Sequence, residues 1–195
     1  TKFLRNTWRP WMKQASRAID AANARRKATF LKNVPFLLSS LSDPRLASRV
    51  ASLFHYEAYG PDDEIVAEGG PADVFFVVCA GTVAAFVTVN GVEIELSELG
   101  VGACFCEAAI NKHAAKNTTG LRALEGGATV LALDRRDRGA LLRAAPGVAA
   151  ELEAVTRHRT AGTLRGMGVP FLASLADESL ERLAAIGHPR QYGLG

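Results

Sequence analysis

Residues 100–123 read G-V-G-A-C-F-C-E-A-A-I-N-K-H-A-A-K-N-T-T-G-L-R-A. It contains a glycine-rich turn, Phe-Cys-Glu at 105–107, an alanine-rich segment and Lys-Asn-Thr-Thr at 116–119. Glycines followed by a short helix leave backbone N–H groups unpaired, and with a cation beside them these groups can bind an anion. The same residues also fit an ordinary helix start in any globular protein, so the flanking sequence has to decide between the two.

Short apolar runs rich in Val, Phe and Ile surround this stretch. The turn signals Gly-Pro-Asp-Asp, Gly-Gly-Pro, Ala-Gly and Asn-Gly separate the upstream runs, which lie at 54–59, 64–68, 74–79, 83–89 and 92–96. Asn90-Gly91 is a strong hairpin signal. Residues 128–133 read as a last strand, followed by an aspartate turn and a helix. We predict an α+β fold in which residues 54–133 form an antiparallel jelly-roll barrel with helices before and after it. Within this range, we expect residues 102–111 to lie in no strand.

Residues 68–87, E-G-G-P-A-D-V-F-F-V-V-C-A-G-T-V-A-A-F-V, add Glu-Gly, Asp-x-Phe-Phe and Gly-x-Val to the pattern. Taken with 100–123, this resembles the cyclic nucleotide-binding domain family over residues 30–145. The resemblance implies cyclic AMP or cyclic GMP as the ligand, no other cofactor and no enzymatic activity. The ligand site it implies consists of Cys106, Glu107, Ala108, Ala109, Lys116, Asn117, Thr118 and Thr119.

The chain departs from the family at the phosphate-binding part of this site. Cys106 replaces a glycine, and the family arginine is replaced by Lys116 in an ungapped alignment or by Asn117 if Arg122-Ala123 is aligned with an Arg-Ala pair. Either replacement removes a planar guanidinium that meets two phosphate oxygens at once. Glu107 matches the glutamate that accepts a hydrogen bond from the ribose hydroxyl in the family. We therefore expect cyclic AMP to bind weakly.

Two functions follow from this resemblance. The first is a non-catalytic regulatory, scaffold or assembly module that has lost strong nucleotide binding, as in some ciliary assemblies. The second is a working sensor of cyclic AMP, cyclic GMP or an uncharged nucleoside, similar to a protein kinase A regulatory subunit. The expected location is the cytoplasm, including the cilium or axoneme.

The N-terminal region is basic and amphipathic. Nine Lys and Arg residues precede residue 34 against Asp20 alone, a net charge of +8 in a chain whose total is +3. Helically spaced apolar residues include Trp8, Trp11 and Ile19, so we expect a helix over 1–29 that buries this face against the barrel or another chain, including a kinase or ciliary partner. Arg25-Arg26-Lys27-Ala28 also spells a kinase pseudosubstrate sequence.

An internal repeat suggests a second module. Val-Pro-Phe-Leu occurs at 34–37 and again at 169–172, and each copy is followed by an aspartate and then a leucine three residues later. We expect a connecting helix over 146–160 and the truncated start of a second cyclic-nucleotide-binding-like domain over 161–195.

Composition excludes several classes. No apolar run approaches the roughly 18 residues of a membrane span. The three cysteines and four histidines form no zinc pattern. No motif in the sequence assembles a nucleophilic triad or a pair of catalytic carboxylates. We expect no catalytic residue, no metal and no nucleic-acid partner.

Overall fold

The computed structural model describes residues 23–38, 40–110, 116–166 and 169–186. The expected N-terminal helix, apart from residues 23–29, lies outside this range. The chain divides into two compact units, residues 1–149 and 150–195.

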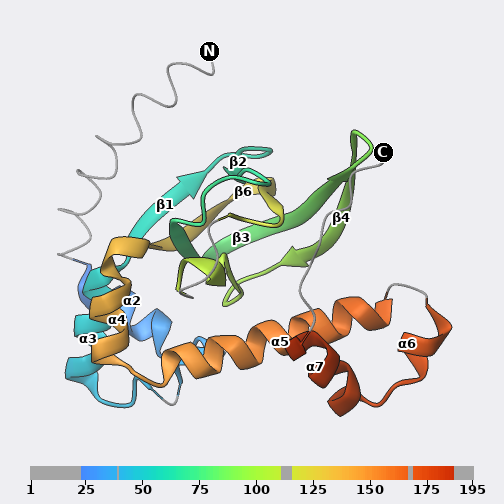
Figure 1. Cartoon of the computed structure of the whole chain (residues 1–195). Helices are drawn as coiled ribbons and strands as arrows, with labels where there is room; N and C mark the ends of the chain where they lie inside the picture. The colour runs from blue at the N-terminus through green and yellow to red at the C-terminus, as the bar shows by residue number, and fades with distance from the viewer. Residues whose placement is uncertain (1–22, 39, 111–115, 167–168, 187–195) are drawn as a thin grey trace. The chain divides into compact units, whose positions relative to one another are not determined.

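The first unit is built on one antiparallel sheet of six strands with the order β1-β6-β3-β4 (Figure 1). The strands are β1 (His55–Tyr59), β2 (Glu64–Val66), β3 (Val74–Val89), β4 (Val92–Leu99), β5 (Cys104–Phe105) and β6 (Gly120–Asp134). β2 pairs with β6, and β5 pairs with β3. The expected antiparallel strands and flanking helices are confirmed, although the sheet does not close into a barrel.

β3 is one long strand where the sequence predicts two. Ala80-Gly81 forms no turn, because register shifts on both sides of Gly81 bend β3 while it stays paired with β6. Gly81 has φ 77°, and a Cβ there would lie 2.1 Å from the carbonyl oxygen of Gly127. Only glycine allows these two long strands to approach so closely at their bends. The Asn90-Gly91 hairpin is confirmed, with φ 53° and 78°.

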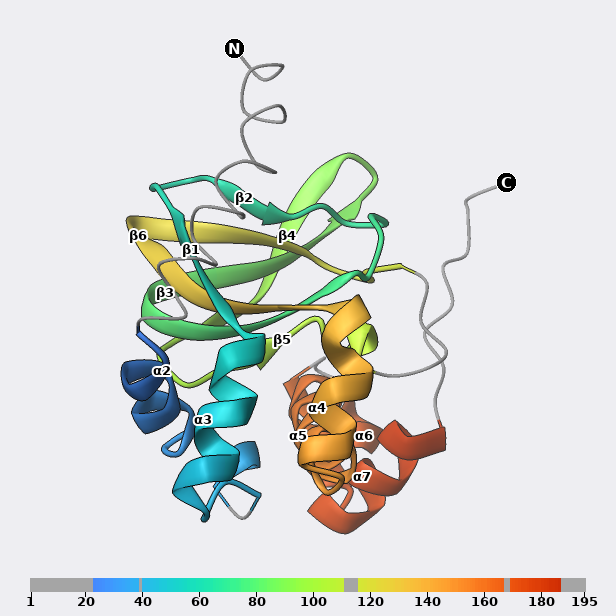
Figure 2. The same cartoon turned by 90° about the vertical axis from the view of Figure 1, so that its left-hand side faces the viewer.

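Helices pack at one end of the sheet. They are α2 (Ala24–Leu31), the short η1 (Pro35–Leu37), α3 (Pro44–Leu53), η3 (Arg135–Asp137) and α4 (Arg138–Ala144). Figure 2 shows α3 and α4 side by side below the strands. Asp43 caps α3 by accepting a hydrogen bond from Arg45 N at 3.0 Å, which satisfies one of the free N–H groups at the helix start.

Arg25-Arg26-Lys27-Ala28 lies within α2, where Lys27 and Ala28 are buried. Lys27 Nζ donates to the carbonyl of Phe54, the last residue before β1. In this conformation the segment is helical and two of its four residues are buried, so the pseudosubstrate interpretation stays a prediction. The buried lysine joins α2 to the start of the sheet.

The second unit is helical. α5 spans Val148–Gly166, longer than the connecting helix predicted over 146–160, and α6 (Pro170–Ser174) and α7 (Asp177–Ile186) follow. No described helix is both long enough and apolar enough to cross a membrane.

Candidate ligand-binding site

The predicted site begins at β5. We predict residues 102–111 to lie outside any strand, but Cys104 and Phe105 pair with Val77 and Phe76 of β3. The rings of Phe76 and Phe105 stack with their centroids 5.0 Å apart. This stacking favours the pairing and explains the extra strand, because aromatic cross-strand pairs stabilise sheets. It fixes where the chain leaves the core and enters the short helix η2 (Glu107–Ala109).

Cys106 joins β5 to η2 in a left-handed conformation, with φ 58° and ψ 40°. This conformation costs a residue with a Cβ about 1–2 kcal/mol, and glycine adopts it readily. The turn therefore keeps the backbone geometry that suits the family glycine, even though the side chain has changed. Cys106 is half-buried and packs against the sheet core.

Glu107 is the first residue of η2 and is half-buried. Its Oε1 lies 3.9 Å from Cys104 Sγ. A carboxylate is favoured at a helix start by the backbone N–H groups there. Ala108 and Ala109 complete η2, and Ala109 and the following Ile110 are fully buried, so this helix is anchored in the core.

Asn117 is a structural residue. It is 8% exposed, and its Nδ2 donates to the Pro71 carbonyl at 3.0 Å. Its backbone N–H donates to Gly70 O and its carbonyl accepts from Gly69 N, at 2.8 and 2.9 Å. Asn117 thus holds the Gly-Gly-Pro turn before β3.

Lys116 differs from its neighbour because its side chain is exposed, while its backbone forms an isolated bridge with Pro71. The ungapped alignment is therefore the one that leaves a cation available at the arginine position. Thr118 is exposed and Thr119 half-buried, immediately before β6. Residues 111–115 lie outside the described part of the chain.

Arg122, used in the alternative alignment, is occupied elsewhere. It forms an ion pair with Glu93 of β4, and its guanidinium lies 4.7 Å from the centre of the Phe86 ring. It therefore links β6 to the edge strand β4 across β3.

Two arginines that sequence reasoning missed tie the site to the helices. Arg138, the first residue of α4, donates from Nε to the Ile110 carbonyl at the end of η2. Arg135 donates to the carbonyls of Ala72 and Asp73, at 3.1 Å through its side chain and 2.7 Å through its backbone. The only sequence signal is the run Asp-Arg-Arg-Asp-Arg at 134–138, which resembles any charged turn.

Among the described residues, no group of three or more His, Cys, Asp or Glu could hold a metal ion. His55 is buried, with Nε2 3.1 Å from Glu57 Oε1. Glu57 also accepts a hydrogen bond from the Tyr59 hydroxyl. These alternate residues of β1 form a structural polar row.

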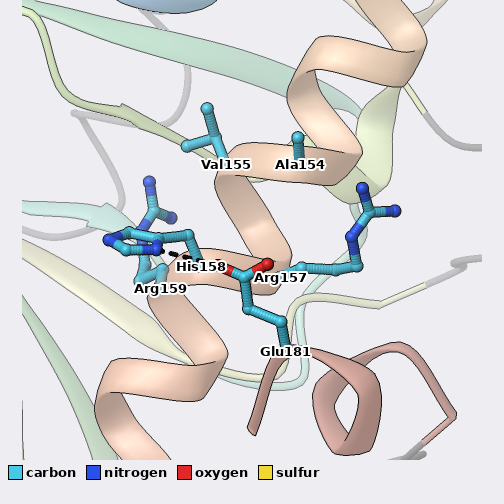
Figure 3. Close-up of a pocket in the computed structure, with 6 residues that line it drawn as sticks. All are labelled: Ala154, Val155, Arg157, His158, Arg159 and Glu181. Atoms are coloured by element: carbon cyan, nitrogen blue, oxygen red, sulfur yellow. Dashed lines mark hydrogen bonds and ion pairs between the residues drawn. The ribbon is translucent and has the colours of Figure 1, made fainter. Parts of the chain in front are cut away.

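A hollow of about 590 Å³ lies between α5 and α7 (Figure 3). Figure 3 shows Glu181 of α7 reaching His158 of α5, with Nδ1 and Oε1 3.2 Å apart. The His158 side chain is 83% exposed, and pairs so open to water contribute little. None of the predicted site residues lines this hollow.

Comparisons with known proteins agree with the fold. Residues 56–145 match the family model of the cyclic nucleotide-binding domain. Among solved structures, the regulatory domain of Toxoplasma gondii PKA with cAMP is 28% identical, with a TM-score of 0.59 over 70% of this chain and 51% of that one. No curated protein sequence matches the chain.

Two more distant structures share the fold. The regulatory subunit of a cAMP-independent protein kinase A from Trypanosoma cruzi, bound to guanosine, is 21% identical with a TM-score of 0.60, over 70% of this chain and 47% of that one. The Thermus thermophilus catabolite activator protein is 24% identical with a TM-score of 0.56, over 77% and 85%. The chain spans about half the length of the kinase regulatory proteins.

Proposed function

Because residues 56–145 belong to the cyclic nucleotide-binding domain family, we propose that the chain is a non-catalytic regulatory module that keeps the ligand-binding fold but binds cyclic AMP weakly. One observation carries this proposal. The turn at Cys106 has a left-handed backbone, and Lys116, which the ungapped alignment puts at the arginine position, is exposed.

The energetic consequence follows from the chemistry of the two cations. Lys116 provides a point charge, whereas arginine provides a planar fork that meets two phosphate oxygens. A hydrogen bond to a charged group contributes roughly 1.5–3 kcal/mol, so the loss of the fork weakens phosphate binding about ten- to a hundredfold. The Cys106 side chain adds bulk where the family backbone approaches the ligand closely.

A nucleoside is the second candidate ligand, and Glu107 favours it. A carboxylate at the start of η2 can accept a hydrogen bond from a ribose hydroxyl, which needs no arginine. The Trypanosoma cruzi structure with guanosine is the reason to test nucleosides directly.

Calorimetric titration of the whole chain with cyclic AMP, cyclic GMP, guanosine and inosine tests the proposal. We expect a cyclic AMP Kd on the order of 10 μM or weaker. Submicromolar cyclic AMP binding would refute the weak-binding proposal, and a guanosine affinity above that for cyclic AMP would favour the nucleoside ligand.

We also infer a tandem arrangement like that of kinase regulators. Val34 and Val169 have nearly the same backbone, with φ/ψ of −79°/124° and −81°/115°, and a proline then starts a short helix in both copies. Val34 is 1% exposed in the first copy and Val169 44% in the second. A second domain covering Val169 would account for this difference. Protein partners, including a kinase, and a cytoplasmic or ciliary location stay predictions.

A further inference from the structure

The hairpin of β3 and β4 carries an exposed apolar stripe. Val89 is 47% exposed, Val92 63%, Ile94 46% and Leu96 44%. Val89 pairs with Val92, and the half-buried Val87 pairs with Ile94, so these four side chains share one face of the hairpin. Leu96 follows on β4 as the extra residue of the bulge between Glu95 and Ser97. β4 is the edge strand of the sheet, and the hairpin extends past the neighbouring strands in Figure 1. We call Val89, Val92, Ile94 and Leu96 the hairpin stripe.

We expect another segment or chain to cover the hairpin stripe. Exposed apolar edge strands promote association, and contiguous apolar patches usually mark an interaction site. The charge around the stripe is acidic, because residues 88–102 contain Glu93, Glu95 and Glu98 and no Lys or Arg. Glu93 and Glu95 alternate with the stripe along β4, and Glu93 is paired with Arg122, so Glu95 and Glu98 are the charges that a segment covering the β4 edge would meet. Pairing two copies of β4 edge to edge would bring glutamates of like charge together, which is unfavourable. The stripe therefore fits a basic segment with large apolar side chains.

We propose that residues 1–22 of the same chain cover the hairpin stripe. This segment carries five Lys and Arg against Asp20, together with the apolar Phe3, Leu4, Trp8, Trp11, Met12 and Ile19. Its apolar side chains match the stripe, and its cations are complementary to Glu95 and Glu98, since Glu93 is already paired with Arg122. It belongs to a region, residues 1–33, with a net charge of +8, and the chain after residue 33 is net acidic.

The segment is long enough to reach. It joins the described chain at Asn23, just before α2. Twenty-two residues span about 33 Å as a helix and roughly 70 Å when extended. A unit of about 150 residues has a radius of gyration near 15 Å. The segment can therefore reach β4 without any rearrangement of the sheet.

Tryptophan fluorescence reports on this segment alone, because both tryptophans of the chain, Trp8 and Trp11, lie within it. The experiment measures acrylamide quenching in the full chain, for the native protein and for Val92→Lys with Ile94→Lys. We expect protected tryptophans in the native protein and severalfold stronger quenching in the variant, because the new lysines repel the basic segment.

The matched control is Leu38→Lys with Val169→Lys, which changes two exposed apolar residues outside the stripe, 56% and 44% exposed. It should leave the quenching unchanged. A second variant, Glu95→Lys with Glu98→Lys, should also increase quenching, and it replaces the first variant if circular dichroism shows that the first does not fold.

Three results would overturn the proposal. The native tryptophans could be quenched as strongly as in urea, or the stripe variants could quench no more than the control. Protection that rises with protein concentration would assign the stripe to a second copy of the chain instead.

Discussion

Cys106 shows a backbone conformation imposed by the fold against the preference of the side chain. Its φ of 58° is costly for any residue with a Cβ. The fixed pairing of β5 with β3 on one side and the buried η2 on the other side leave the chain no other path. The backbone at Cys106 is therefore strained, and a glycine at this position would relieve the strain.

Cys106→Gly should raise the free energy of unfolding relative to Cys106→Ala by about 1 kcal/mol, because only glycine relieves the left-handed strain. Alanine is the matched control, since it also removes the thiol but keeps the Cβ. Urea denaturation measures both. Equal stability of the two variants would mean that the turn relaxes and stores no strain.

At the level of single residues, the sequence indicated which residues belong to the candidate site better than it indicated what each of them contacts. Glu107 starts η2 as expected, but the two alignments of the cation could not be separated from letters alone. The bond from Asn117 to Pro71, which ties Asn117 to the turn at 69–71, joins residues 46 apart and could not be read from the local sequence. Arg138 could not be found for the same reason, since its partner Ile110 lies 28 residues away.

Among the secondary-structure elements, local sequence patterns predicted where strands lie but did not predict that two of them, at 74–79 and 83–89, form the single strand β3. Asn90-Gly91 forms a turn, and the two strands on either side of it, β3 and β4, pair directly with each other. Ala80-Gly81 forms no turn, because β6 bends at Gly126 and Gly127, both of positive φ, and keeps β3 paired through the bend. Only the partner strand distinguishes a turn glycine from a bend glycine.

Gly81→Ala should therefore destabilise the protein far more than Gly91→Ala. Both positions have positive φ, which costs alanine about 1 kcal/mol. At Gly81 the new Cβ also meets the Gly127 carbonyl, whereas nothing lies within 4 Å at Gly91. Such overpacking adds about 1–3 kcal/mol. Thermal unfolding compares the two, and similar losses would show that the sheet shifts to accept a Cβ at the bend.

For the whole molecule, the repeated Val-Pro-Phe-Leu motif predicts two copies of one structural unit. Val34 and Val169 have nearly the same backbone conformation, but Val34 is buried and Val169 is exposed. Val34→Ala should cost about 1–3 kcal/mol because Val34 is 1% exposed. Val169→Ala, at 44% exposed, should stay within about 0.5 kcal/mol.

Both changes are measured in this chain by chemical denaturation. In a longer protein containing a second sheet, Val169→Ala should become as costly as Val34→Ala. A large cost for Val169→Ala already in this chain would show that the second unit is complete by itself.

We propose that the turn at Cys106 keeps a backbone that suits glycine, and that binding is weak because Cys106 and Lys116 stand where the family has glycine and arginine. The direct test is calorimetric titration of Cys106→Gly with Lys116→Arg, using cyclic AMP, with guanosine as the ligand that has no phosphate. We predict that the cyclic AMP affinity rises about ten- to a hundredfold over the native protein, that the guanosine affinity changes little, and that adding Glu107→Ala abolishes the gain. A repaired protein that binds cyclic AMP no better than the native chain would contradict the account.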